Sequence, residues 1–417
     1  SSTSNTASNN TAVGASALTA NTTGTQNVAV GSNALALNTT ASNNTAVGYN
    51  SLNANTTGTA NVAVGYSAGI SLTTGAYNTI VGANAGMDLV TGGSCTFVGE
   101  EAGQNATGGA NTFVGAFAGE NYSGGNNNTS LGRAALLGVD GSSTGDNNVA
   151  IGYNSMLANT TGASNVALGA FALDANTTGA SNTAVGQEAL TTNVTGGDNS
   201  AFGRRALNSN TTGASNTAIG LESLYANTTA SNNTAVGTSA LGANTTGEGN
   251  TAVGYSAGLS VSTGSNNVLI GQQAGQSGVL LTTGAANTII GNYAHTTAAG
   301  TIDAQILGYN VAGEGGYTTV GNGASDIRAA NGTATWAAVS DERYKKDIVD
   351  STAGLSFINA LQPRTFKYKT LGELPETFRA YEADSTEVFK NSDTNHGFIA
   401  QEIKAAIDAD DSIADGF

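Results

Sequence analysis

A five-residue pattern of apolar and polar positions repeats along most of the chain. It has the form Asn-x-x-x-Gly (the pentad), with Thr or Val second in nearly every copy and an apolar residue fourth. β-branched residues at alternate positions favour a strand, and the closing Gly favours a tight turn. The glycines follow a period of 17 residues with one 16-residue and two 20-residue steps: Gly14, Gly31, Gly48, Gly65, Gly82, Gly99, Gly115, Gly132, Gly152, Gly169, Gly186, Gly203, Gly220, Gly237, Gly254, Gly271 and Gly291.

This regular spacing predicts the fold class. One short strand per copy cannot enclose a core alone, but stacked copies share a core with their neighbours. The sequence therefore predicts an all-β fold, a parallel β-solenoid or β-roll of about seventeen 17-residue coils. We expect residues 1–295 to form this repeat region, 296–339 a Gly-rich transition, and 340–417 a separate module.

Two positions in each coil vary together in size. The third residue after each pentad Gly is Ala or Ser, and the fourth is Leu or Met in most copies and Gly in six. After Leu or Met, the middle residue of the next pentad is always Ala. After Gly it is large, as in Gly69 with Ile80, except for Gly119 with Ser130. Because voids and overpacking both destabilise a core, this exchange of volume predicts that the two positions touch.

Asparagine begins sixteen of the seventeen pentads, and Cys95 replaces it in the other. Stacked amides can satisfy one another's donors and acceptors between successive coils, so we expect an asparagine ladder. We expect Cys95 to occupy a shielded ladder position rather than to act as a reactive thiol. The stretch Asn-Thr-Thr-Gly between pentads is typical of turns and predicts the return loop.

Composition narrows the function classes. The chain has 417 residues and a net charge of −16, and residues 1–339 contain no lysine and only four arginines. This disfavours nucleic acid and anionic membranes as partners, because both require clustered basic residues. No apolar run is long enough for a membrane span. With one cysteine and two histidines, we expect neither a metal site nor a cofactor.

Residues 340–417 have a mixed composition and a candidate reactive pair. Ser340 and Lys345 lie five residues apart across a polar stretch. A lysine whose pKa is lowered by burial can activate a hydroxyl or a water, as in Ser-Lys hydrolases. The alternative is a solvated turn between a strand and a helix.

The repeated pentads NTAVG, NVAVG and NVAIG resemble the head repeats of trimeric autotransporter adhesins of the YadA-like type, over about residues 10–295. The resemblance implies a left-handed parallel β-roll whose three chains associate laterally. The 17-residue period is longer than the pattern of that family. We expect the small residues and the Leu-or-Gly position after each pentad to line the surface between the three chains.

The C-terminal residues resemble the endosialidase-type intramolecular chaperone module of phage tail fibres and tailspikes. Three blocks carry the resemblance, namely SDERYKKDI from Ser340, LQPRTFKYK from Leu361 and NHGFIAQEI from Asn395. It implies a module that drives trimerisation and then cuts itself off at the Ser340–Asp341 bond, with Ser340 and Lys345 as the catalytic dyad. The remaining signature residues, which we interpret as packing and helix initiation, are Gly397, Phe398, Ala400, Gln401 and Glu402.

Chemistry limits how this bond can be cut. Attack by the Ser340 hydroxyl on its own carbonyl would close a four-membered ring. A base-activated water or a serine from a neighbouring chain fits better, with Lys345 as the proton acceptor. The family continues into further helices after the region that here ends at Phe417, so we expect an incomplete module.

These observations predict a homotrimeric fibre or adhesin segment for host attachment, located in a virion tail fibre or at a cell surface. A host glycan or protein receptor would be its partner, and self-cleavage would be its only catalysis. The alternatives are a bacterial cell-surface trimeric adhesin and an ice-binding β-solenoid. The tyrosines just after a pentad Gly are either sugar-stacking rings or edge packing: Tyr49, Tyr66, Tyr153 and Tyr255.

Overall fold

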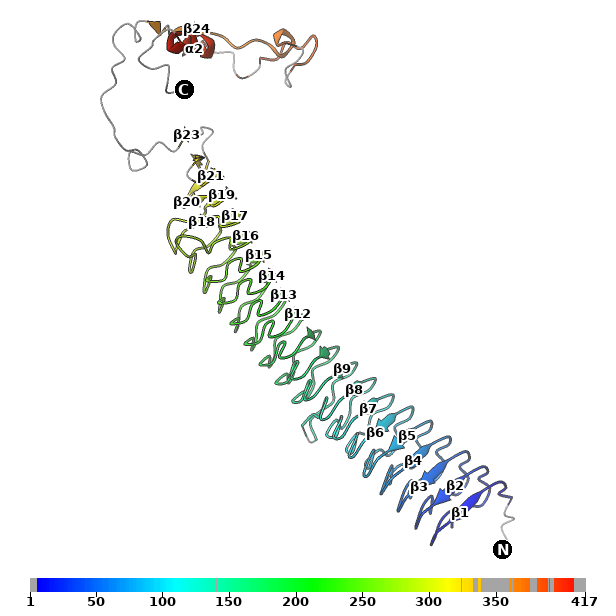
Figure 1. Ribbon diagram of the computed structural model, residues 1–417. Helices are drawn as coiled ribbons and strands as arrows, with labels where there is room; N and C mark the ends of the chain where they lie inside the picture. The colour runs from blue at the N-terminus through cyan, green and yellow to red at the C-terminus, as the bar shows by residue number, and fades with distance from the viewer. Residues whose placement is uncertain are drawn as a thin grey trace. The chain divides into compact units, whose positions relative to one another are not determined.

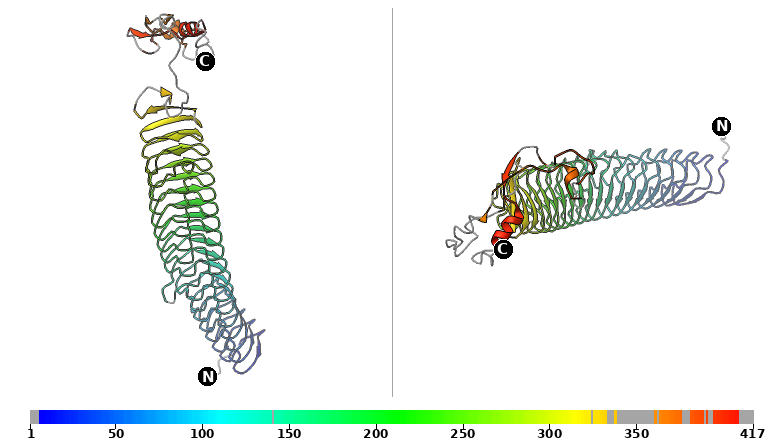
Figure 2. Two further views of the ribbon diagram at one scale, coloured as in Figure 1. Left: turned by 60° about the vertical axis from the view of Figure 1, so that its left-hand side comes forward. Right: turned by 90° about the horizontal axis from the view of Figure 1, so that it is seen from above.

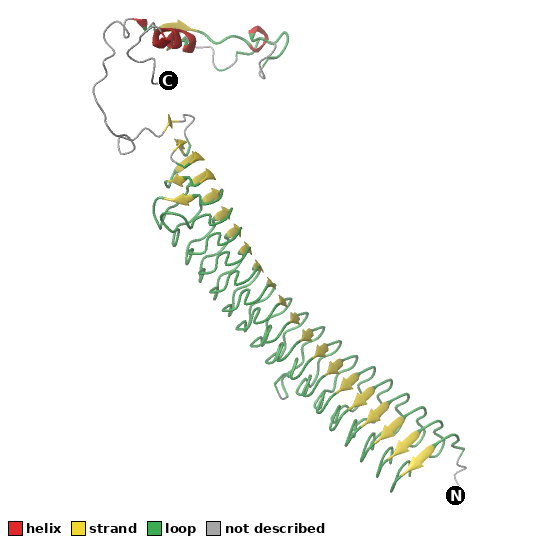
Figure 3. Cartoon of the chain, viewed as in Figure 1, coloured by secondary structure: helices red, strands yellow, loops and turns green. Residues whose placement is uncertain are grey.

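The chain divides into two compact units, Ser1–Val339 and Ser340–Phe417. The computed structural model describes residues 6–139, 141–323, 325–332, 337–338, 360–361, 363–375, 381–388, 390 and 394–408. The first unit is a stack of coils, and each coil has one short strand joined by long turns (Figures 1 and 3).

The pentads form the strands of this stack, as the alternating pattern predicts. Each strand is three residues long and comprises the second to fourth residues of a pentad. The strands are β1 (Thr11–Val13), β2 (Val28–Val30), β3 (Thr45–Val47), β4 (Val62–Val64), β5 (Thr79–Val81), β6 (Thr96–Val98), β7 (Thr112–Val114), β8 (Thr129–Leu131), β9 (Val149–Ile151), β10 (Val166–Leu168), β11 (Thr183–Val185), β12 (Ser200–Phe202), β13 (Thr217–Ile219), β14 (Thr234–Val236), β15 (Thr251–Val253), β16 (Val268–Ile270) and β17 (Thr288–Ile290).

Every strand pairs in parallel with the strand of the next coil, and equivalent residues lie opposite one another. Ala12 pairs with Ala29 at the start of the stack, and Leu269 pairs with Ile289 near its end. The predicted parallel β-solenoid is therefore confirmed, and Figure 2 shows the strands aligned along one side of the stack. At the usual spacing of parallel strands, seventeen coils extend over roughly 80 Å.

The stack continues beyond the seventeenth pentad. Strand β19 (Gln305–Tyr309) pairs in parallel with β17, and β21 (Tyr317–Asn322) pairs in parallel with β19. Beside them, β18 (His295–Thr296) pairs with β20 (Ala312–Gly313). The sheet then changes direction, because β22 (Ser325–Ala330) pairs antiparallel with both β21 and β23 (Ala337–Ala338). The Gly-rich transition thus adds coils before an antiparallel end.

The core of the solenoid lies beneath the middle residue of each strand. From Ala29 onward these middle side chains are fully buried, whereas the residues on either side of them face outward and are partly or largely exposed. The Ala or Ser and the Leu that follow each pentad Gly are also buried, as at Ala34 and Leu35. The expectation that these positions line a surface between chains is wrong, because they pack inside their own coil.

Direct contact explains the exchange of volume in this core. A Cβ added to Gly69 would lie 3.0 Å from Ile80 Cδ1, and one added to Gly86 would lie 3.0 Å from Phe97 and 3.3 Å from Ile80. The predicted contact is therefore confirmed. The structure adds that Ile80 is bounded by a glycine in its own coil as well as in the preceding coil.

This two-sided contact removes the one apparent exception to the pattern. A Cβ added to Gly119 would lie only 2.4 Å from the ring of Phe113, which belongs to the same coil. Gly119 is thus required by Phe113, and the coil of Ser130 carries the fully buried Leu136 at the position that Gly86 holds beside Ile80. By contrast, Ile80, Phe97, Phe113 and Leu269 each have a glycine at this position both in the preceding coil and in their own coil.

The contact between Gly258 and Leu269 provides a test of this packing. A Cβ at Gly258 would lie 2.5 Å from Leu269 Cδ1, so Gly258→Leu alone overpacks the core and should cost about 1–3 kcal/mol. Leu269→Ala alone leaves a void and should cost about 2–5 kcal/mol. The double variant restores the pair of side chains seen at Leu241 and Ala252 and should cost less than the sum, as measured by chemical denaturation. Simple additivity would contradict the packing described.

Buried asparagines join each coil to the next in two ladders. In the predicted pentad ladder, the Asn165 N–H donates to Asn148 Oδ1 at 3.0 Å, and Asn165 Nδ2 donates to the Gly179 carbonyl at 2.8 Å. A second ladder uses the return-loop asparagines: Asn176 Nδ2 donates to Asn159 Oδ1 at 2.9 Å and to the same Gly179 carbonyl at 3.0 Å. Both ladders are fully buried, so the amides replace the water that these polar groups lose.

Cys95 interrupts the pentad ladder. Its backbone N–H donates to Asn78 Oδ1 at 2.9 Å, but its Sγ lies 3.6 Å from the Gly93 and Gly108 carbonyls and offers no oxygen to Asn111. Burial raises the pKa of this thiol, which fits the expected shielded position.

Restoring the amide at this position should stabilise the stack. Cys95→Asn supplies an acceptor for the Asn111 N–H and a stronger donor to Gly108, which we expect to add about 0.5–1.5 kcal/mol. Thermal denaturation measures the change, with Cys95→Ser as the control that reduces the side chain to a small hydroxyl. A Cys95→Asn protein that is less stable than Cys95→Ser would show that the ladder cannot be completed here.

Candidate functional site

The C-terminal unit brings two of its three sequence blocks together. Strand β24 (Arg364–Phe366) pairs antiparallel with β25 (Asn395–Gly397), so that Arg364 lies opposite Gly397 and Phe366 opposite Asn395. Helix α2 (Ala400–Asp408) begins three residues after β25. The residues between the two strands in the sequence include a short 3-10 turn, η2 (Leu371–Glu373).

A bidentate ion pair fastens α2 to this sheet. Arg364 Nε donates to Glu402 Oε2 at 2.9 Å, and Arg364 Nη2 donates to Glu402 Oε1 at 2.7 Å. The paired hydrogen bonds match the planar fork of the guanidinium to the carboxylate. The hydrogen bond from Arg364 lowers the pKa of Glu402, and the reciprocal bond raises the pKa of Arg364. The pair fixes the first turn of α2 relative to β24.

Smaller contacts order the segment that follows β24. The Tyr368 ring lies edge-on to Phe366 at 5.5 Å, and the Lys390 ammonium lies 5.2 Å from the Tyr368 ring centre. The Thr370 N–H donates to Glu373 Oε2 at 3.0 Å, which lowers the pKa of Glu373. Phe366 and Tyr368 of the second block thus pack against each other, and Tyr368 also contacts Lys390.

The expected reactive residues lie outside the described residues. This holds for Ser340, Asp341 and Lys345, so the dyad and the scissile bond stay predictions. Among the other signature residues, Gly397 ends β25, Phe398 is half exposed, and the first three residues of α2 are Ala400, Gln401 and Glu402.

Sequence reasoning missed the partner of Glu402. Arg364 lies 38 residues earlier in the chain, and no local spacing rule connects the two. The sequence shows only that the second block contains a basic residue and the third an acidic one, which does not predict that the two form an ion pair. Phe398 and Ile399 are exposed and present apolar surface on the described part of this unit.

The solenoid presents an outer apolar ladder, defined as the residues that precede each pentad Gly. These side chains face outward from the parallel sheet, and the most exposed within the stack include Leu131, Leu168 and Phe202 at 41–48%. The ladder comprises Val13, Val30, Val47, Val64, Val81, Val98, Val114, Leu131, Ile151, Leu168, Val185, Phe202, Ile219, Val236, Val253, Ile270 and Ile290. A continuous apolar row of this length on a surface is typical of an interaction site.

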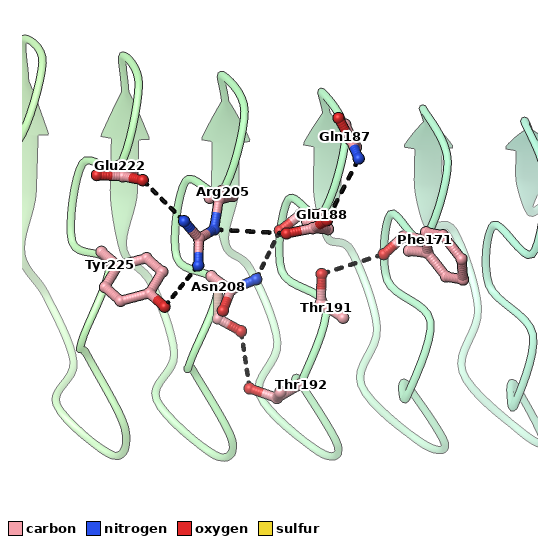
Figure 4. A network of polar contacts seen from close by, with 9 residues as sticks. All are labelled: Phe171, Gln187, Glu188, Thr191, Thr192, Arg205, Asn208, Glu222 and Tyr225. Atoms are coloured by element: carbon pink, nitrogen blue, oxygen red, sulfur yellow. Dashed lines mark hydrogen bonds and ion pairs between the residues drawn. The ribbon is translucent and has the colours of Figure 1, made fainter.

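A second surface, the corner face, is formed by the first, second and fifth residues after each pentad Gly. Arg205 lies there between Glu188 and Glu222, with Nε 3.4 Å from Glu188 Oε2 and Nη1 3.0 Å from Glu222 Oε1 (Figure 4). Its Nη2 donates to the Tyr225 hydroxyl at 2.9 Å, and its guanidinium lies 4.7 Å from the Tyr225 ring centre. Two glutamates and a tyrosine of the same solenoid thus contact this arginine.

Comparison with known proteins bears on the C-terminal unit. Residues 340–411 match the family model described as chaperone of endosialidase. The match supports an intramolecular chaperone module in this part of the chain. Together with the parallel β-solenoid before it, this chaperone module fits a tail-fibre-like protein. Searches of the curated proteins and of the solved structures found no match to the chain.

In the part of the chain that the structure describes, no helix combines the length and the apolar character that crossing a bilayer requires.

The pKa shift of Glu402 predicts how the chaperone module responds to acid. A carboxylate whose pKa is lowered on folding stabilises the folded state above its unfolded pKa, and this stabilisation is lost as the pH falls through the folded pKa. The protection of the amides of residues 394–408, meaning their exchange rate relative to the intrinsic rate at the same pH, should therefore fall in acid in the unmodified chain. In Glu402→Gln this protection should already be lower at neutral pH and should change less with acid. Glu387→Gln, an exposed glutamate of the same unit, is the matched control. Equal exchange in Glu402→Gln and the control would contradict a structural role for the ion pair.

Proposed function

We propose that the chain is the shaft or head of a homotrimeric tail fibre that attaches a virion to its host, assembled by a self-cleaving chaperone. The match of residues 340–411 to the endosialidase chaperone family carries this proposal. The long solenoid before it has the form expected of a fibre, and its coil-to-coil register repeats without interruption from β1 to β17.

The outer apolar ladder supports lateral association of three copies. It follows one side of the sheet along the whole repeat region, where a single chain leaves it facing solvent. Partners that share the same 17-residue period would match it coil for coil, which an unrelated partner could not do. The half-exposed Phe398 and the neighbouring Ile399 provide apolar surface for contacts between chaperone modules.

Self-cleavage would separate the finished fibre from its chaperone. Lys345 would remove a proton from a water or from a neighbouring chain's serine, and the nucleophile would attack the Ser340 carbonyl carbon. Breaking the Ser340–Asp341 bond passes a proton to the Asp341 amine, and in the serine route water then releases the ester. External substrates would not be turned over.

Variants of the expected dyad test this processing. In the full-length protein, denaturing gels should show a fragment that ends at Ser340, and mass spectrometry fixes its terminus. Ser340→Ala or Lys345→Ala should remain uncut but still trimeric, because folding and cutting are separate roles of the module. Cleavage that continues unchanged in either variant would show that the dyad is assigned wrongly.

A charge placed in the outer apolar ladder tests the proposed trimer surface. Ile219→Glu puts a carboxylate where three chains would meet, and its desolvation should lower the temperature at which the trimer dissociates. Val194→Glu introduces the same charge at a similarly exposed apolar residue of the return loop and is the control. Analytical ultracentrifugation at rising temperature distinguishes them. Identical dissociation of both variants would exclude the ladder as the interface.

A further inference from the structure

The corner face carries a pocket at the one place where the repeat is most irregular. The 16-residue step ends at Gly115 and a 20-residue step begins at Gly132, so two changes of period lie within a few coils. A pocket of about 350 Å³ opens here, lined chiefly by Phe117, Glu120, Arg133, Leu137, Tyr153 and Asn154. Its volume lies at the lower end of the range for small-molecule sites, which favours one or two sugar-sized rings over a polymer segment.

Aromatic rings hold the arginine of this pocket. The Arg133 guanidinium carbon lies 5.4 Å from the ring centre of Phe117 and 5.9 Å from that of Tyr153. Tyr153 is itself braced edge-on by Phe171 at 5.3 Å. Cation–π contacts of this kind position a guanidinium without neutralising it.

Arg133 differs in this respect from Arg205 on the same face. Arg205 has a ring contact together with two glutamates, whereas no carboxylate of the described residues lies within ion-pair distance of Arg133. Both arginines lie on the corner face of the same solenoid, so they differ in their neighbouring side chains rather than in the surface that carries them. Among the described residues, no carboxylate takes up the hydrogen-bond donors of Arg133, and a planar carboxylate is the group that a guanidinium fork fits best.

We propose that this pocket binds a sugar ring that carries a carboxylate, as part of a host surface glycan. The rings of Phe117 and Tyr153, together with Leu137, provide apolar surface for the C–H face of the sugar. The Tyr153 hydroxyl and the Asn154 amide supply donors and acceptors for its hydroxyl groups. Glu120, which also lines the pocket, disfavours ligands with several negative charges, such as nucleic acid.

This inference rests on the proposed attachment function and assigns it a site. In a trimer the pocket would occur three times, so weak binding at each copy would add up to firm attachment to a glycan-covered surface. The pocket lies on the corner face rather than on the outer apolar ladder, so ligand and partner chains would use different surfaces.

Two sugars test the proposal, methyl glucuronide and methyl glucoside. They are alike except that the first carries a carboxylate where the second carries a hydroxymethyl group. Calorimetry or saturation-transfer NMR on the trimer should show that glucuronide binds more tightly. Arg133→Gln should weaken glucuronide binding by about tenfold or more and abolish the preference, and Arg133→Lys should retain part of it. Tyr153→Ala should weaken both sugars. Tyr255→Ala, which removes the exposed tyrosine at the same repeat position of another coil, should change neither.

The outcomes separate this pocket from the attachment function. Circular dichroism and sedimentation confirm that each variant is folded and trimeric. Equal binding of the two sugars, or glucuronide binding that Arg133→Gln leaves intact, overturns the pocket. If a glycan array retains the trimer through glycans whose binding both Arg133→Gln and Tyr153→Ala leave unchanged, attachment stands and this site is wrong. If the trimer binds host cells but no glycan, the receptor is a protein and the sugar site is likewise overturned.

Discussion

The solenoid depends on hydrogen bonds between the buried asparagine side chains of one coil and groups of the neighbouring coil. Asn165 and Asn176 are fully buried, and each donates to a carbonyl of its own loop while its side-chain oxygen accepts from the next coil. Such groups would destabilise an isolated coil, because their hydrogen-bonding partners lie in its neighbour. The ladders therefore make the coils interdependent and fix the register, since a shift by one residue would leave every amide unpaired.

Around these ladders the core is filled in two alternative ways. Coils with Leu or Met at the fourth position after Gly, such as Leu173, carry the second asparagine ladder, as at Asn176, except for the coil of Leu136. Coils with Gly at that position replace this asparagine with an apolar residue, as Leu72 and Leu89 do, and make room for Ile80 and Phe97. Tyr122 connects the two arrangements. Its hydroxyl accepts from Asn159 Nδ2 at 2.8 Å, and burial raises its pKa to about 12.

The interior and the surface of each coil differ in how much their residues can vary. The interior of each coil is constrained by volume and hydrogen bonding, so variation concentrates on the corner face, where Arg133, Tyr153 and Arg205 replace the small polar residues of other coils. The outward side of the sheet is constrained differently and keeps an apolar residue before every pentad Gly. The proposed chain interface and the proposed sugar site thus lie on separate surfaces of one repeated unit.

The sequence predicts the all-β repeat architecture, the strand positions, the pentad asparagine ladder and the contact between Gly69 and Ile80, because each follows from a periodic pattern or from paired volumes within it. It could not determine which side of the coil is buried, since Ala34 and Leu35 are apolar in either arrangement. Only closure of the coil placed them inside and the outer apolar ladder outside. Likewise, the pairs Arg364–Glu402 and Arg133–Tyr153 join residues in different strands, helices or coils. Tertiary structure decided these contacts, because folding brings together side chains whose separation in the chain carries no information about distance.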